Sequence, residues 1–299
     1  MWSAEAIVQA LDEWGELWQS ASGLVGLRGD AEKLCQALER RLADFARDEG
    51  AGEWRVPPAI PLSSLARADY FASFPQWLTT ASHLRDDDVT LAAIAAADRP
   101  EERVAAALAP TTTALQPAVC YQIYDALAGR VLEEPLVVTA QGTCWRHEGD
   151  RLRPLERGWA FTMREIVCIG TSSEVEDFRQ RMIMRVTRLA ADLGLESALQ
   201  LANDPFFAPT AYGRTLIQRL KALKHELMLP IGPVRQLAAA SFNHHENFFG
   251  KAFDIRLVDG SPAASGCVAF GLERWLLAFL VQHGPDPVLW PPIETHVLS

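Results

Sequence analysis

The segment from Cys144 to Gly170 concentrates residues that could bind a nucleoside triphosphate. Arg146 and Glu148 are separated by one residue, a polar basic loop follows, and the strand-like return carries Phe161. A guanidinium fork can hold phosphate oxygens in bidentate fashion. A carboxylate can accept from an exocyclic amine, and an aromatic ring can lie on a purine face. The pattern predicts a nucleotide-gripping hairpin, although Arg-x-Glu alone is common by chance.

Three residues on well-separated segments could bind a metal ion: Cys120, Glu165 and Cys267. Two thiolates and a carboxylate would leave one position of a tetrahedral zinc ion open. A buried free cysteine is more often only a small apolar side chain, so the residue types leave both interpretations open. A rival metal site is the run from His244 to Glu246. Adjacent residues of a strand face opposite ways, so we interpret this run as polar surface or loop residues.

Composition sets broad limits on the function. The chain has 299 residues, of which 49% are hydrophobic and 22% charged, as in a soluble globular protein, and its net charge of -10 argues against a nucleic-acid-coating surface. The acidic N-terminus lacks the basic region of a signal peptide, and no apolar run is long enough to cross a bilayer. Five widely spaced cysteines without a CxxC motif favour a reducing cytoplasm. The three aspartates at 86–88 are interpreted as a solvated turn.

Apolar periodicity predicts helices and strands in alternation along the chain. Helices are expected at 3–19, 31–48 (capped by Asp30), 172–193 (capped by Ser172 and Ser173), 212–223 and 275–281. Strands are expected at 53–56, 131–140, 226–229, 236–243, 252–257 and 265–274. Residues 23–29 form a turn or irregular strand, residues 91–109 short helices, and residues 118–124 either a strand or a helix start. No nucleophile elbow, phosphate-cradling glycine loop or HExxH motif is present.

Three segments, in order, resemble the motifs of class II aminoacyl-tRNA synthetases of the seryl type. Residues 30–58 resemble the first motif, residues 144–165 the second, and residues 266–280, with Gly271-Leu-Glu-Arg274, the third. The resemblance implies an α+β fold: an antiparallel sheet of six or more strands flanked by helices, in a homodimer. It also implies a single catalytic domain over 1–299. Residues 1–29 would form an N-terminal helical extension, and residues 205–224 an inserted loop and basic helix.

The departures from the seryl pattern point to a narrower family. Only residues 1–29 precede the first motif, where a seryl enzyme has a long helical arm. Cys120 stands where most seryl enzymes have a substrate-binding carboxylate. With Glu165 and Cys267 it matches the zinc ligands of metal-dependent seryl enzymes and of their truncated homologues, the amino acid–carrier-protein ligases. The runs 163–170 and 241–245 resemble the truncated family in particular.

The resemblance also implies a role for each site residue. Arg146 would hold the α-phosphate of ATP, Glu148 the adenine amine, Phe161 the adenine ring and Arg274 the γ-phosphate, with the two arginines catalytic. Ser241 and Asn243 would line the amino-acid pocket. Arg214, Arg219 and Lys221 would dock an acidic carrier protein, although each also fits a solvated helix face. Gln236 lies near an acidic position that helps hold ATP-bound magnesium in seryl enzymes, which puts metal binding there in doubt.

The resulting prediction is a cytoplasmic, zinc-dependent enzyme that uses ATP with magnesium. It would convert a small amino acid, glycine or alanine, to an aminoacyl adenylate. It would then transfer the aminoacyl group to the phosphopantetheine thiol of a carrier protein, with no tRNA and no membrane involved. Two alternatives remain open: a tRNA-charging enzyme, and a catalytically silent paralogue that serves as a binding or regulatory protein.

Overall fold

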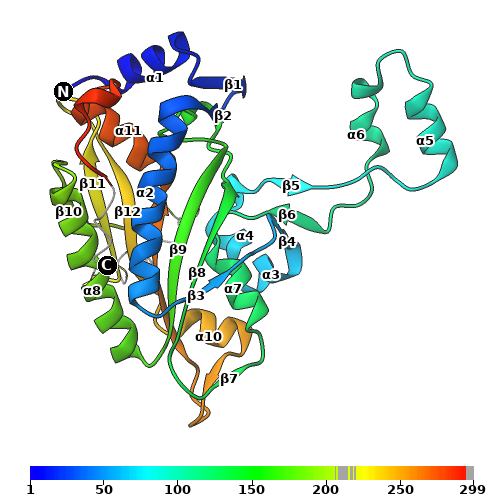
Figure 1. The fold of residues 1–299 in the computed structure, drawn as a ribbon. Helices are drawn as coiled ribbons and strands as arrows, with labels where there is room; N and C mark the ends of the chain where they lie inside the picture. The colour runs from blue at the N-terminus through cyan, green and yellow to red at the C-terminus, as the bar shows by residue number, and fades with distance from the viewer. Residues whose placement is uncertain (206, 208–214, 216–217, 219, 294–299) are drawn as a thin grey trace.

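The computed structural model describes residues 1–205, 207, 215, 218 and 220–293, and within them a seven-stranded sheet forms the centre (Figure 1). Its strand order is β10-β11-β12-β14-β9-β8-β3. All neighbours are antiparallel except β3 and β8. The strands are β3 (Gly52–Trp54), β8 (Leu136–Trp145), β9 (Ala160–Gly170), β10 (Ala198–Leu201), β11 (Lys224–Pro230), β12 (Gln236–His244) and β14 (Ala264–Gly271). The predicted α+β class with a largely antiparallel sheet is confirmed.

Two groups of elements cover the two faces of this sheet. Long helices cover one face, where Ile166, Val268 and Phe242 of three neighbouring strands join a fully buried apolar core. These helices are α1 (Ala4–Glu13), α2 (Gly29–Asp48), α8 (Ser172–Asp192) and α11 (Leu272–His283). The other face packs against α3 (Leu62–Arg67), α4 (Tyr70–Ser73), α7 (Cys120–Ala126) and α10 (Phe248–Phe253). The second face carries the polar site described below.

Smaller elements complete the chain. Short strand pairs are β1 (Leu17–Ala21) with β2 (Leu24–Leu27), β7 (Val131–Leu132) with β13 (Arg256–Leu257), and β6 (Thr113–Leu115) with β4 (Ala59–Pro61) and β5 (Thr80–Ala81). Helices α5 (Asp88–Ala95) and α6 (Val104–Ala107) stand away from the body in Figure 1. No helix within the described ranges is long and apolar enough to span a membrane.

The structure corrects several sequence-based boundaries. The first helix ends at Glu13, and 17–21 is a strand, because Gly15 takes a positive φ and turns the chain. The expected strand at 252–257 is instead the last two residues of α10, a turn at Asp254 with a positive φ, and the two residues of β13. The cap of α8 is Thr171, in a reciprocal capping box with Glu174, and not Ser172 or Ser173. The residue before α2 is Arg28, so Asp30 lies inside the first turn of α2 and does not cap it. The expected strand 131–140 is split at 133–135 into β7 and β8.

One buried arginine joins four elements around the sheet. Arg164 of β9 is 5% exposed, and its guanidinium donates to Glu39 of α2 at 2.6 Å and to Glu53 of β3 at 3.1 Å. It also donates to the hydroxyl of Thr139 in β8 at 3.0 Å. These bonds hold α2 and β3 against the strand whose next residue is Glu165.

Replacing Arg164 by Met should lower the free energy of unfolding by about 3–5 kcal/mol, because Glu39 would be left partly buried and unpaired. Denaturant unfolding followed by circular dichroism measures this. Arg188→Ala is the matched control, since its ion pair with Asp192 is exposed, and we expect a change of at most about 0.5 kcal/mol. Equal effects of the two substitutions would contradict the role given to Arg164.

Candidate functional site

The site is built on the alternate residues of three neighbouring strands. Because side chains of a strand alternate between faces, residues paired in register form rows on one face of the sheet. The first row is Glu165, Ala269 and Ser241, and the next is Val167, Cys267 and Asn243. Glu165 and Cys267 therefore lie one row apart on adjacent strands, facing away from the helix-packed core.

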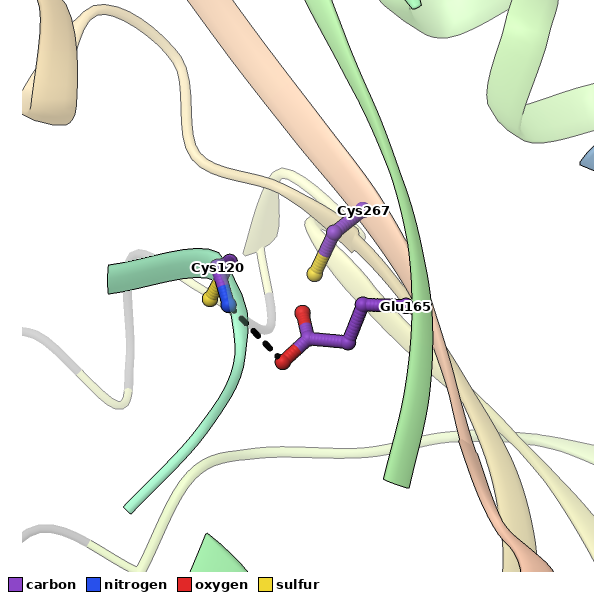
Figure 2. Close-up of side chains that lie close together, drawn as sticks. All are labelled: Cys120, Glu165 and Cys267. Carbon is purple, nitrogen blue, oxygen red and sulfur yellow. Dashed lines mark hydrogen bonds between the residues drawn. The ribbon is translucent and has the colours of Figure 1, made fainter. Parts of the chain in front are cut away.

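Helix α7 brings Cys120 onto these rows. The backbone amides of Val119 and Cys120 donate to Oε1 of Glu165 at 2.8 and 3.2 Å, which fixes the start of α7 over the sheet. Figure 2 shows Cys120, Glu165 and Cys267 converging from a helix and two strands. All three are buried, and their ligand atoms lie within 4.8 Å of one another. We call these three residues the Cys-Glu-Cys triad.

The donor set of this triad fits a zinc ion. Zinc takes thiolate, imidazole and carboxylate ligands, and three protein ligands are typical of sites that keep one position for a small molecule. The hydrogen bond to Cys267, followed by burial, raises the pKa of the Cys120 thiol well above its usual value. A metal ion must therefore displace thiol protons when it binds.

Two further side chains contact the sulfur of Cys267. The amide nitrogen of Asn243 lies 3.4 Å from it, and Nε2 of His245 lies 3.8 Å away. Burial lowers the pKa of His245 to about 4, so the imidazole is neutral near pH 7. The interpretation of this run as surface or loop residues was wrong for His244, which is buried at the end of β12, whereas His245 lies in the loop just after that strand and is partly buried. The two do face different partners, as expected: His244 is 7% exposed and contacts Ser172.

Three arginines gather at the other end of the site. Arg146 lies just after β8, Arg157 in the hairpin loop and Arg274 in the first turn of α11. Burial, then the charges of Arg157 and Arg146, lower the pKa of Arg274 to about 10, so it remains a cation. Arg274 donates to the carbonyls of Glu156 and Ala238 at 2.8 and 3.0 Å. We call Arg146, Arg157 and Arg274 the arginine cluster; the charge of Glu148, which pairs with Arg157, offsets part of the repulsion among them.

The hairpin also positions its acid and its aromatic ring. The guanidinium carbon of Arg146 lies 5.4 Å from the centre of the Phe161 ring and 5.2 Å from that of Trp77, and its Nε donates to the carbonyl of Pro117 at 2.9 Å. Glu148 accepts from Arg157 at 2.5 Å. Arg146 therefore contacts two aromatic rings, and such contacts stabilise a cation that is shielded from water.

One cavity of about 640 Å³ joins the two ends of the site. Nine of the predicted site residues line it: Cys120, Arg146, Glu148, Phe161, Glu165, Ser241, Asn243, Cys267 and Arg274. Gln236 is exposed and does not line the cavity, whereas Glu226 does. Of the predicted docking residues, Lys221 forms an ion pair with Glu246 at 2.6 Å, and Arg214 and Arg219 lie outside the described residues.

Sequence reasoning missed several residues of this cavity. Arg157 lies in the basic loop of the hairpin, where its charge was the only signal. Lys224 bonds to Asp204 at 2.6 Å and to Glu226 at 3.2 Å, and Gln218 donates to Asp204 at 2.8 Å. Burial raises the pKa of Asp204, but Lys224 and Gln218 lower it by more, so the carboxylate stays ionised. These partly buried side chains come from separate parts of the chain, and no spacing in the sequence predicts that they meet.

Comparison with known proteins agrees with this geometry. Residues 107–283 match the family described as tRNA synthetase class II core domain (G, H, P, S and T). Amino acid–acyl-carrier-protein ligases 1 and 2 of Bradyrhizobium diazoefficiens are each 34% identical to the chain, over 273 and 287 residues. These matches cover 89% and 94% of the chain, and 83% and 85% of the two ligases. The chain belongs to the amino acid–acyl-carrier-protein ligase family.

More distant relatives of this ligase-family chain are synthetases. Type-2 serine–tRNA ligase of Methanopyrus kandleri is 30% identical over 192 residues, which cover 59% of the chain and 36% of that ligase. The crystal structure of the M. kandleri enzyme with a selenocysteine tRNA of A. aeolicus superposes with a TM-score of 0.83 at 23% identity, covering 96% of the chain and 59% of the synthetase. At this identity the structural likeness establishes the class II fold.

The Cys-Glu-Cys triad predicts one zinc ion per chain. Cys120→Ala should weaken zinc binding by more than the roughly 10–100-fold that changes beyond the ligands usually cost. Metal content after dialysis, and competition with a chromophoric chelator, measure this. Cys35→Ala is the matched control, because Cys35 is buried in the helix-packed core, outside the triad, and should keep wild-type affinity. Unchanged zinc binding in Cys120→Ala would reject the triad as the metal site.

Proposed function

We propose that this ligase activates a small amino acid with ATP and transfers the aminoacyl group to the phosphopantetheine thiol of a carrier protein. The observation that carries the proposal is the single cavity that holds the Cys-Glu-Cys triad at one end and the arginine cluster at the other. The Cys-Glu-Cys triad, which with a metal ion would bind an amine, thus lies across the cavity from the arginine cluster, which suits a triphosphate.

In the first step, the amino-acid carboxylate attacks the α-phosphorus of ATP, the bond to the β-phosphate breaks, and pyrophosphate leaves. We assign Arg146 to the α-phosphate and Arg274 to the γ-phosphate, with Glu148 at the adenine amine and Phe161 on the ring. Adenylyl transfer depends mainly on positioning and on stabilising the developing negative charge. The arginines meet that need because Arg146 is held between two rings and Arg274 is tied to two carbonyls.

At the other end, Cys120, Glu165 and Cys267 would hold the zinc ion, which supplies a Lewis-acid position for the neutral amino group of the substrate. The bonds from Val119 and Cys120 keep Oε1 of Glu165 in place, and Ser241 and Asn243 line the substrate space beside it. With its amino group held at this end of the cavity, the substrate would keep its carboxylate free to face the α-phosphate.

In the second step, the thiol sulfur of the carrier attacks the carbonyl carbon of the adenylate, the bond to the phosphate oxygen breaks, and AMP leaves as the thiol loses its proton. We assign docking of the acidic carrier to the inserted segment, with Arg214, Arg219 and Lys221. The base of that segment adjoins the cavity, since Asp204, Pro205 and Gln218 line it. Lys221 would exchange its partner Glu246 for a carboxylate of the carrier.

We propose glycine or alanine as the amino acid. Ala269 lies between Glu165 and Ser241 on the cavity floor, and Ala118 lines the same space beside Cys120. At these two positions only a methyl group borders the space, which suits a small amino acid, while Ser241 and Asn243 supply the polar contacts beside them. One added methylene in such a pocket is worth roughly 1–3 kcal/mol, so discrimination between the two need not be large.

We also propose a single catalytic domain over 1–299 that forms a cytoplasmic homodimer. Strand β3 ends the seven-stranded order and pairs only with β8 in that sheet, so its other edge is available to a second copy. All five cysteines are free, which suits a reducing compartment.

Pyrophosphate exchange tests the first step. Zinc-loaded protein should exchange pyrophosphate into ATP in the presence of glycine or alanine, and Arg146→Ala should lower the rate by roughly 10²–10³-fold, the usual effect of losing one transition-state donor. Arg188→Ala, on the exposed face of α8, should behave as wild type. No exchange with any amino acid would overturn the proposal in favour of a silent paralogue.

Acceptor choice tests the second step. The radiolabelled aminoacyl group should move to a holo-carrier protein and be released by hydroxylamine, as expected of a thioester. The matched control is the same carrier without its phosphopantetheine arm, which should remain unlabelled. Labelling of total tRNA instead of the carrier would establish the tRNA-charging alternative.

A further inference from the structure

His245 is fixed at both ring nitrogens beside the triad. Its Nδ1 lies 3.2 Å from the hydroxyl of Tyr124 and 3.4 Å from that of Ser265, and its Nε2 lies 3.8 Å from the sulfur of Cys267. The ring meets Phe249 edge-on, with centres 4.9 Å apart and planes at 89°. The backbone amide of His245 donates to the carbonyl of Ser265 at 2.8 Å. This packing sets the ring orientation without any contribution from a metal ion.

The surroundings select one tautomer of this imidazole. A neutral imidazole carries a proton on one nitrogen and accepts at the other, whereas a hydroxyl can either donate or accept. A metal-bound cysteine sulfur carries no proton and can only accept. A lone pair on Nε2 would then face the lone pairs of Cys267, so the proton must be on Nε2. Nδ1 then carries the lone pair, to which the nearer hydroxyl, that of Tyr124 at 3.2 Å, can donate.

We propose that His245 is a positioning residue of the zinc site, which donates Nε2–H to the thiolate of Cys267 and orients that ligand. Asn243 supplies a second N–H to the same sulfur at 3.4 Å. In the part of the chain that the structure describes, no N–H donor reaches the sulfur of Cys120. The inference rests on the zinc binding proposed above and adds an asymmetry to it: one thiolate is hydrogen-bonded and the other is not.

This asymmetry has a chemical consequence. Hydrogen bonds draw electron density from a thiolate, so Cys267 would donate less charge to the metal than Cys120 does. Groups that contact metal ligands orient them and tune the metal, and their loss typically weakens metal binding by roughly 10–100-fold. A less neutralised zinc ion attracts an amine ligand more strongly, which connects His245 to capture of the amino-acid substrate.

Paired substitutions at His245 test the proposal. His245→Leu keeps similar bulk without a donor and should weaken zinc binding by about 10–100-fold. His245→Gln retains an amide N–H and should recover most of that loss. In the cobalt-substituted protein, the thiolate-to-metal charge-transfer band should move to lower energy in His245→Leu, because the sulfur becomes richer in electrons. Chelator competition and absorption spectroscopy read both effects without any measurement of activity.

Two tyrosine variants distinguish a specific effect on zinc binding from a general effect of the substitution on folding. Tyr124→Phe removes a hydroxyl that donates to Nδ1 and should weaken zinc binding by less than His245→Leu does. Tyr70→Phe makes the same change at a tyrosine whose hydroxyl is buried and has no hydrogen-bond partner within the described residues, and it should leave affinity unchanged. Wild-type zinc affinity and an unshifted cobalt band in both His245→Leu and Tyr124→Phe would overturn the inference alone. Failure of wild-type protein to bind zinc would instead overturn the proposed zinc site itself.

Discussion

The hydrogen bonds from the amides of Val119 and Cys120 to Glu165 are the contact on which the site depends. They join the start of α7 to strand β9 inside the sheet. Cys120 of α7 is thereby brought close to Cys267 of β14, more than a hundred residues later in the sequence. A buried carboxylate is costly unless hydrogen bonds satisfy it. The two bonds that fix the start of α7 therefore also offset the cost of burying Glu165, and they leave its second oxygen for a ligand.

Because side chains alternate along each strand, one face of the sheet forms the apolar core and the other face carries the polar site. On one face, Ile166, Val268 and Phe242 are fully buried against long helices, and this face supplies most of the apolar burial. The other face can then hold a cavity with ionisable groups without loss of the core. Arg164 belongs to the first face and Glu165 to the second, so adjacent residues of one strand serve two different purposes.

Positive charge gathers at the end of the cavity opposite the Cys-Glu-Cys triad. Burial, then the charges of Arg157 and Arg146, lower the pKa of Arg274, whereas Arg157 is partly exposed and paired with Glu148. Surrounding carbonyls and aromatic rings hold these side chains in place despite their repulsion. In the proposed function, a bound triphosphate would stabilise this arrangement, and the fixed positive charges would meet the negative charge that develops in the reaction.

Apolar periodicity predicted most of the long helices and strands, and the residues that resemble class II motifs identified nine residues that line the cavity. Local signals were enough there because apolar spacing and the order of motifs can be read directly from the sequence. Boundaries set by a single glycine, as at Gly15, or by capping, as at Thr171, were misplaced. Only the folded chain shows that His245 contacts Cys267 and that Lys224, Asp204 and Gln218 form one partly buried group. Those facts depend on strand register and on burial, which place residues distant in the chain side by side, and no local pattern encodes such contacts.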